Sequence, residues 1–352
     1  MPRTLLITGG SGYFGSVLAE QARARGETVR IFDLNPPGPE LAGVEFVAGD
    51  VRDRSAVRAA CEGVDVVFHN VAQVPLAKDR ALFDEVNVGG TANVLVAARD
   101  ARVAKVVHTS SSAVFGIPEH NPVTEDSPCL PLEAYGRAKL RAEILCRDAT
   151  ASGLDVTVIR PRTVLGHGRL GVMALLFEFV ADGAPVFVLG GGNNRYQLVH
   201  ANDLADACLR AGEREGASVY NIGALEFGTM RETLQALVDH ARTGSRLRSL
   251  PVAPARLAMR TLASLGLAPF APYHWLLYSE SLYFDVSKAR SELGWEPQHS
   301  NASMVIESYE WFLEHRVPGG GGGAGAEGDD AARSHHQSPV KLGLLRALKA
   351  LP

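Results

Sequence analysis

The stretch TLLITGGSGYFGSVLAE, residues 4–20, places a glycine-rich turn between a short apolar run and a helix-forming segment. Its Gly9, Gly12 and Gly15 follow the spacing GxxGxxG. A tight turn with positive φ, a close backbone approach to a ligand and close packing of helix on strand all favour glycine. The first-turn amides of the helix then favour a phosphate group. The stretch therefore predicts a strand, a phosphate-binding turn and a helix that begin a βαβ unit.

Apolar runs and helix-like segments alternate through the first half of the chain. After residues 4–8, the strand-like runs are residues 28–33, 44–49, 64–69, 103–111 and 154–160. Helix-like segments separate them, including a long one over roughly 81–101. This alternation is typical of a parallel sheet that is covered by helices on both faces. We expect an α/β protein with a Rossmann-type, doubly wound parallel sheet and a smaller C-terminal substrate-binding lobe.

The domain boundary is expected where the alternation loosens and proline and glycine become frequent. This places a nucleotide-binding domain at residues 1–160 and a substrate-binding lobe at 161–316, while residues 219–223 could return to the main sheet. Residues 317–340 are glycine-rich, which is typical of a flexible linker. Residues 341–352 would form a short amphipathic tail that could contact a membrane surface, dock on a partner or fray.

Composition narrows the class of protein. A net charge of -4 over 352 residues argues against a dedicated nucleic-acid surface. No apolar run approaches the ~20 residues that a membrane-spanning helix needs, and the N-terminus lacks a signal-peptide layout. The four cysteines lie far apart without a CxxC pair, and the histidines form no ligand-spaced cluster. We expect a cytoplasmic protein without a metal site, peripheral to a membrane only through its tail.

Two aspartates follow the second and third strand-like runs. Asp33 stands 18 residues after Gly15. In a dinucleotide-binding βαβ unit, an acid about 20 residues beyond the glycines accepts hydrogen bonds from the adenosine ribose and repels a 2′-phosphate. Because no arginine directly follows Asp33, the sequence favours NAD over NADP; a turn-capping role is the alternative. Asp50 could meet the adenine amino group or cap the next helix.

The segment EAYGRAKL, residues 133–140, places Tyr135 and Lys139 one helical turn apart, so their side chains share one face. A tyrosine with a pKa near ~10 is a poor base at neutral pH. A neighbouring ammonium group stabilises the phenolate, and lowering the pKa to about 7 requires ~4 kcal/mol. The serine cluster at 110–112 ends a strand-like run, where a substrate is expected to bind. These residues predict acid–base chemistry on a bound alcohol or ketone.

Several motifs occur in the order found in one known family. They are TGGSGYFG (8–15), VNVGGT (86–91), TSSSAVFG (109–116), YGRAK (135–139) and IRPRTVLG (159–166). Together they resemble an extended short-chain dehydrogenase/reductase of the NAD-dependent epimerase/dehydratase type, over residues 4 to about 315. The resemblance implies an NAD-dependent enzyme that transfers a hydride at a secondary alcohol or ketone carbon. It also implies a homodimer, paired through the helices around 81–101 and 133–150.

The motifs and the resemblance together give the candidate site residues. Tyr135 would be the general acid/base, Lys139 would tune it and bind the nicotinamide ribose, and Ser111 would hold the substrate oxygen, with Ser112 as the rival. The candidate cofactor-binding residues are Gly9, Gly12, Tyr13, Phe14, Gly15, Asp33, Asp50, Val51, Val71, Ala72, Asn87, Tyr135 and Lys139. The candidate substrate-binding residues are Ser111, Ser112, Tyr135, Arg162 and Arg195. Asn87 could equally be structural.

Two substrate classes agree with the sequence. The resemblance across residues 113–139 favours a nucleotide-sugar epimerase, in which Arg195 would reach the diphosphate although it stands one residue from the usual arginine position. The apolar stretch 250–284 and the weakened phosphate pattern favour the alternative, a dehydrogenase or ketoreductase that resembles 3β-hydroxysteroid dehydrogenases. A sugar 4,6-dehydratase is disfavoured because no Asp–Glu pair follows Ser111. A scaffold without activity is disfavoured by the intact serine, tyrosine and lysine.

Overall fold

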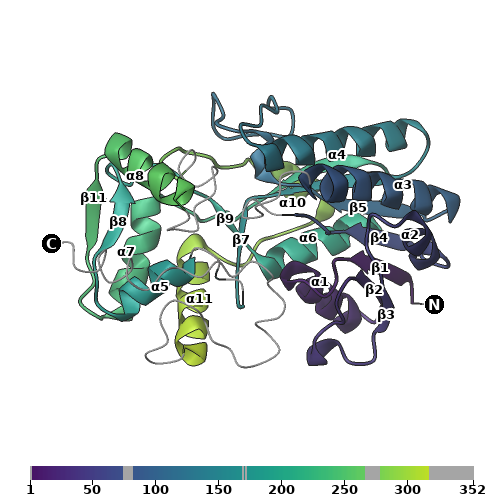
Figure 1. Ribbon diagram of the computed structural model, residues 1–352, viewed down its shortest axis with the longest axis horizontal. Coiled ribbons are helices and arrows are strands. Elements are labelled where there is room, and N and C mark those ends of the chain that lie inside the picture. The colour runs from purple at the N-terminus through teal and green to yellow at the C-terminus, as the bar shows by residue number, and fades with distance from the viewer. Residues whose placement is uncertain (1, 74–81, 169, 171–172, 266–277, 317–352) are drawn as a thin grey trace. The chain divides into compact units, whose positions relative to one another are not determined.

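The computed structural model describes residues 2–73, 82–168, 170, 173–265 and 278–316 (Figure 1). The chain divides into two compact units. The first comprises Met1–Thr163, Ala201–Gly223 and Phe284–Pro297, and the second comprises Val164–His200, Ala224–Tyr283 and the chain from Gln298 onward. The linker and tail expected at 317–340 and 341–352 lie outside the described residues. Among the described helices, none combines the length and the hydropathy that crossing a membrane requires.

The first unit is built on a sheet of seven parallel strands in the order β10-β6-β5-β4-β1-β2-β3. The strands are β1 (Thr4–Thr8), β2 (Thr28–Asp33), β3 (Glu45–Ala48), β4 (Val66–His69), β5 (Lys105–Thr109), β6 (Val156–Pro161) and β10 (Ser218–Ile222). All six residues of β6 are buried, as expected for a strand covered on both faces. This sheet confirms the predicted Rossmann-type fold class.

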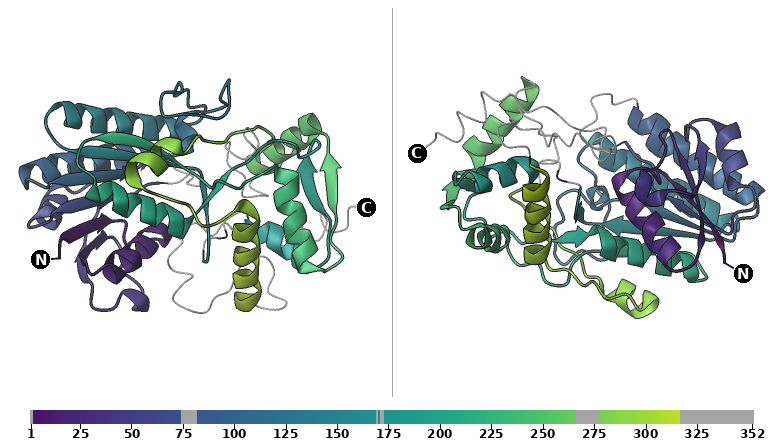
Figure 2. Two further views of the ribbon diagram at one scale, coloured as in Figure 1. Left: turned by 180° about the vertical axis from the view of Figure 1, so that it is seen from behind. Right: turned by 90° about the horizontal axis from the view of Figure 1, so that it is seen from below.

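Helices cover both faces of that sheet (Figures 1 and 2). Helices α2 (Arg54–Cys61), α3 (Thr91–Asp100) and α4 (Ala134–Ala151) lie on one face, and α1 (Tyr13–Ala24) and α6 (Ala201–Glu213) pack together on the other. The remaining helix, α10 (Ser287–Leu293), packs against β10 and α6. The helical stretch predicted at roughly 81–101 begins with a π-helical segment, η2 (Phe83–Gly90), that continues into α3. Two short 3-10 turns complete this unit, η1 (Pro39–Leu41) and η3 (Ser112–Val114).

The second unit combines short strand pairs with helices. The strands β8 (Val186–Leu189) and β11 (Leu247–Leu250) run parallel, and β7 (Thr163–Leu165) pairs with β9 (Leu198–His200). The helices are α5 (Met173–Ala181), α7 (Met230–Ala241), α8 (Val252–Ser264) and α11 (Asn301–His315). Its core is partly aromatic: the ring of Phe177 on α5 packs against Tyr309 and Phe312 on α11, with centroids 5.7 and 5.8 Å apart. Burial of such rings stabilises the unit together with the aliphatic side chains of the same core.

Candidate functional site

The glycine-rich turn after β1 has the geometry that its sequence predicts. Gly9 has a φ of 71°, in the left-handed region that favours glycine. A Cβ atom on Gly15 would lie 2.0 Å from the carbonyl oxygen of Gly9, so only glycine fits there. Gly12 is the N-cap of α1, and no acidic residue stands in the first turn, where Tyr13 and Phe14 begin the helix. The helix N-terminus can therefore accept a negatively charged ligand.

Asp33 lies beside this turn. Its carboxylate accepts hydrogen bonds from the backbone N–H of Ser11 and of Asn35, each over 3.2 Å. The hydroxyl of Ser11 in turn donates to the carbonyl oxygen of Asn35 over 2.7 Å. These bonds hold a partly exposed carboxylate next to the phosphate-binding turn, which is where the ribose of a dinucleotide would need an acceptor. The turn and Asp33 together fit such a cofactor.

Asp50 is engaged by a neighbouring arginine. The guanidinium of Arg52 donates to both of its carboxylate oxygens, and this contact lowers the pKa of Asp50 from its ordinary value. The N-cap of α2 is Asp53, whose side chain accepts from the N–H of Ser55 and of Ala56, so the capping alternative for Asp50 is wrong. The adjacent Val51 is 3% exposed and belongs to the core. To contact adenine as well, the carboxylate of Asp50 would have to bind the adenine amino group and Arg52 at the same time.

Asn87 fixes the segment that follows β4. From η2 its side-chain oxygen accepts from the N–H of Gln73 over 2.7 Å, and its amide donates to the carbonyl oxygen of Gln73 over 3.0 Å. Two bonds to one residue hold Val71 and Ala72 beneath the glycine turn, where a Cβ on Gly9 would lie 3.1 Å from the nitrogen of Val71. Asn87 is 1% exposed. The structure thus gives it a positioning role for backbone that lines the turn.

The serine cluster after β5 separates into three environments. Ser110 is buried and donates to the carboxylate of Glu143. Ser112 is also buried, and its hydroxyl accepts from the guanidinium of Arg162 over 2.9 Å. Ser111 is half-buried and caps η3, its hydroxyl accepting from the N–H of Ala113 over 3.2 Å. Of the three hydroxyls, that of Ser111 is the most accessible to a substrate.

Tyr135 and Lys139 lie on the first turns of α4, which begins at the N-cap Glu133. The carboxylate of Glu133 accepts from the N–H of Tyr135 and of Gly136, each over 2.6 Å. A Cβ on Gly136 would lie 2.4 Å from the carbonyl oxygen of Ala113, so this glycine lets α4 approach η3. The close packing therefore brings the predicted tyrosine next to the serine turn. The ring of Tyr135, half-buried, also meets that of Phe83 edge-on at 6.3 Å.

Lys139 is buried beneath this turn. Its ammonium donates to the carbonyl oxygen of Thr109 over 2.8 Å, and the residue is 2% exposed. Burial lowers the pKa of Lys139 to about 8, since the charged form loses its hydration. At neutral pH, below that value, the ammonium still carries its charge. A positive charge one turn from Tyr135 is the feature that would make the phenol a usable base.

The two candidate arginines lie in different units. Arg162 is 1% exposed in the first unit, where it bonds Ser112 and lies over the ring of Phe284 at 5.7 Å. Arg195 is exposed in the second unit, where its guanidinium lies 4.7 and 4.3 Å from the ring centroids of Phe227 and Tyr283. Only Arg195 is therefore open to a ligand without displacing a neighbour from the core.

Several residues that build the site do not stand out in the sequence. Thr109 contributes a backbone oxygen, and the two aromatic rings beside Arg195 come from segments more than 30 and 80 residues away along the chain. Their contribution depends on tertiary packing, which no local pattern reveals. Glu133 gave little signal as well, because the residues preferred at an N-cap are Ser, Thr, Asp and Asn.

Comparison with known proteins agrees with this geometry. Residues 5–223 match the sequence profile of the NAD dependent epimerase/dehydratase family. An uncharacterised protein of Sinorhizobium fredii is 52% identical over 98% of this chain and 85% of its own length. Short-chain dehydrogenase/reductase family 42E member 1 of Bos taurus is 32% identical over 90% and 89%. The UDP-glucose 4-epimerase of Mycolicibacterium smegmatis is 30% identical over 87% and 97%.

The fold is also shared with solved structures. The UDP-glucose 4-epimerase of Thermotoga maritima, determined with UDP-glucose, superimposes with a TM-score of 0.73 at 23% identity, covering 88% of this chain and 99% of the other. The glycine turn, Asp33 and the buried lysine beneath the serine turn are the parts expected of an NAD-dependent site. The chain belongs to the NAD-dependent epimerase/dehydratase family of extended short-chain dehydrogenases/reductases and is an NAD-dependent enzyme.

Proposed function

We propose that this enzyme interconverts the epimers of a nucleotide sugar. The observation that carries the proposal is the exposed guanidinium of Arg195, which packs against the rings of Phe227 and Tyr283 in the second unit. The two rings also contact each other, with centroids 5.2 Å apart, so both lie on one side of the guanidinium. The exposed N–H donors of Arg195 would bind a diphosphate. The relative from Mycolicibacterium smegmatis, named a UDP-glucose 4-epimerase, supports the same substrate class.

The reaction removes a proton from a sugar hydroxyl and a hydride from the carbon that carries this hydroxyl. The site therefore needs one acceptor for the proton and one for the hydride. Tyr135 would take the proton of the sugar hydroxyl and return it after the keto sugar has turned over. NAD, held by the glycine turn and Asp33, would supply the acceptor for the hydride and the hydride that is returned. Lys139, charged below its pKa of about 8, would stabilise the phenolate, and Ser111 would hold the substrate oxygen. Because proton and hydride both return, no NADH accumulates.

The test offers the purified enzyme a panel of UDP-sugars with NAD and follows the products by NMR and the reduced cofactor by absorbance. We expect one epimer to form from the other with no stoichiometric NADH. Tyr135→Phe should abolish turnover and leave NAD affinity nearly unchanged. Arg195→Lys keeps the charge but loses the planar fork, so it should raise KM about tenfold or more with little change in thermal stability. If no UDP-sugar turns over and an alcohol reduces NAD stoichiometrically, the epimerase assignment fails.

A dehydrogenase or ketoreductase for an apolar substrate is the second candidate. Helix α8 exposes Leu257, and Leu265 directly after it is also exposed, at 65% and 64%. Exposed leucines in the second unit would suit an apolar ligand. The relative from Bos taurus, named a short-chain dehydrogenase/reductase, supports this candidate too. Part of the apolar stretch 250–284, residues 266–277, lies outside the described residues.

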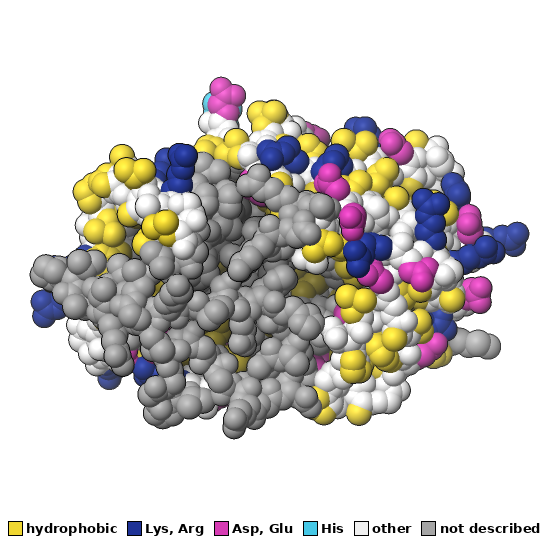
Figure 3. All heavy atoms as spheres, in the orientation of Figure 1, with side chains coloured by type: hydrophobic (Ala, Val, Ile, Leu, Met, Phe, Trp, Pro, Cys, Tyr) yellow, Lys and Arg dark blue, Asp and Glu magenta, His cyan; other side chains and the backbone are white. Residues whose placement is uncertain are grey.

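The proposed homodimer would pair through α3 and α4. Both helices expose a large apolar side chain, Val96 on α3 at 48% and Ile144 on α4 at 39%. Figure 3 shows apolar groups among basic and acidic ones on the face that carries these helices. An interface with a polar rim and apolar centre would fit such a surface. Val96→Glu with Ile144→Lys should convert a dimer to a monomer in sedimentation analysis; an unchanged mass would exclude this interface.

A further inference from the structure

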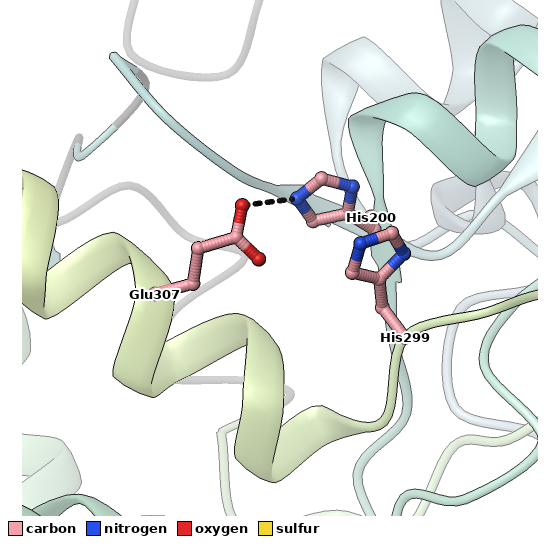
Figure 4. A group of neighbouring side chains, drawn as sticks. All are labelled: His200, His299 and Glu307. Atoms are coloured by element: carbon pink, nitrogen blue, oxygen red, sulfur yellow. Dashed lines mark ion pairs between the residues drawn. The ribbon is translucent and has the colours of Figure 1, made fainter.

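Three potential metal ligands meet in the second unit, and one of them is distant from the other two in the sequence. His200 ends β9, His299 precedes α11, and Glu307 lies on α11 (Figure 4). Each offers one ligand atom, and these atoms all lie within 4.8 Å of one another. His200 is 3% exposed, while the other two are partly exposed. Sequence spacing alone gave no sign of this cluster, because 99 residues separate the two histidines.

We propose that His200, His299 and Glu307 bind a zinc ion. Zinc bonds of 2.0–2.1 Å in a tetrahedron place two ligand atoms about 3.3 Å apart. The Nε2 of His200 and the Oε1 of Glu307 are 3.4 Å apart, which matches that separation. Two imidazoles with one carboxylate are a typical zinc donor set, whereas calcium and magnesium prefer oxygen alone.

The rings of His200 and His299 lie face to face. They are stacked, with centroids 3.8 Å apart and planes inclined by 17°. Metal binding uses the lone pair of a neutral imidazole nitrogen from each ring. Parallel rings direct their lone pairs side by side. Binding of one ion by both therefore turns the ring of His299, which is the more exposed of the two.

A fourth ligand is within reach. His167, in the loop after β7, places its Nε2 2.7 Å from the same oxygen of Glu307. It is exposed, so its ring can move to complete a tetrahedron. With four protein ligands zinc would be structural, and it would join the end of β9, the segment before α11 and α11 itself. The ion would then stabilise the second unit and have no part in hydride transfer.

The experiment measures zinc on the full chain without an affinity tag. Protein stripped with a chelator is dialysed against a slight excess of zinc, and the bound metal is counted by mass spectrometry while the melting temperature is recorded. We expect about one zinc per chain and a melting temperature several degrees higher with zinc. Glu307→Gln and His299→Ala should each lose the ion and the thermal shift. Cobalt in place of zinc should give the visible absorption of a tetrahedral site in the native chain only.

A matched control is available in a second histidine–glutamate pair that involves α11. His240 of α7 pairs with Glu310 of α11 over 3.0 Å, with no third ligand residue identified beside them in the described part of the chain. His240→Ala should keep the zinc and the thermal shift. All variants retain His335 and His336, so metal on those residues adds the same background to each. Equal zinc in native chain, Glu307→Gln and His299→Ala, or none in the native chain, would overturn the proposal.

Discussion

Ser111 and Ser112 are adjacent in sequence, but their hydroxyls have different surroundings. The hydroxyl of Ser112 lies in the core and accepts from Arg162. That of Ser111 caps a short turn at the half-buried surface, near the start of α4. The sequence could not choose between them because three serines in a row leave the register open. The difference in burial makes the two roles separable by substitution.

Alanine at Ser111 should lower kcat, whereas alanine at Ser112 should lower the free energy of unfolding. Ser111→Ala removes a hydroxyl that would hold the substrate oxygen, so we expect kcat to fall about 10²-fold with only a small change in melting temperature. Ser112→Ala leaves the buried guanidinium of Arg162 without one acceptor, so the free energy of unfolding should fall by about 1–3 kcal/mol. Steady-state kinetics and urea denaturation of both variants make the comparison. A larger kinetic defect in Ser112→Ala, at intact stability, would transfer the substrate role to Ser112.

At the scale of the element, the glycines of the turn between β1 and α1 have different roles, one in packing and one in cofactor binding. Gly15 packs helix on strand, since its Cβ would lie 2.0 Å from the oxygen of Gly9. Gly12 has an ordinary φ of -78°, and a Cβ there would lie 3.3 Å from that oxygen. Alanine at Gly12 therefore needs a much smaller backbone shift than alanine at Gly15, but its methyl group would stand where a pyrophosphate approaches the backbone.

We predict a corresponding split between the two alanine variants. Gly15→Ala should lower the stability of the cofactor-free protein by about 1–3 kcal/mol because the helix has to move. Gly12→Ala should keep that stability and weaken NAD about tenfold or more. Thermal unfolding without cofactor, followed by NAD titration under calorimetry, distinguishes them. Unaltered NAD affinity in Gly12→Ala would mean that the pyrophosphate does not approach this residue.

At the scale of the whole molecule, the sequence predicted the features that depend on local sequence patterns. The glycine turn and the alternation of strands and helices were sufficient for the parallel sheet, since each depends on residues within one βαβ unit. The zinc cluster could not be predicted, because His200 and His299 meet only after the second unit has folded. The aromatic pair beside Arg195 has the same origin, with Phe227 and Tyr283 from separate segments. Such tertiary contacts leave no periodic pattern in the sequence.

The centre of the first unit also contains a pair of buried histidines. His69 on β4 and His108 on β5 are both 1% exposed, and their rings lie 5.3 Å apart. His69 hydrogen-bonds with the hydroxyls of Thr8 and Thr91, over 2.8 and 3.0 Å. Neither ring nitrogen of His108 has a hydrogen-bond partner among the described residues. Burial lowers the pKa of His69 to about 3 and that of His108 well below its ordinary value.

These pKa shifts make the whole molecule sensitive to acid. Below pH ~6.5 the unfolded chain binds a proton at each histidine that the folded chain does not bind, so the free energy of unfolding falls as the pH falls. Each histidine contributes about 1.4 kcal/mol per pH unit in that window, and above it the penalty is absent. His108→Leu should therefore match the native stability at pH 7 within about 1 kcal/mol, because its removal leaves no buried group without a hydrogen-bond partner. Between pH 6 and pH 5 it should lose about 1.4 kcal/mol less than the native chain.

His69→Leu is the matched control. It removes the same slope, but it deprives Thr8 and Thr91 of a buried partner and should already be about 1–3 kcal/mol less stable at pH 7. Native-state hydrogen exchange of the amides of β4 and β5 reads the stability of the first unit alone, so unfolding of the second does not confuse the result. Parallel pH curves for the native chain and His108→Leu would show that His108 is protonated in the folded protein, against its burial between the two strands.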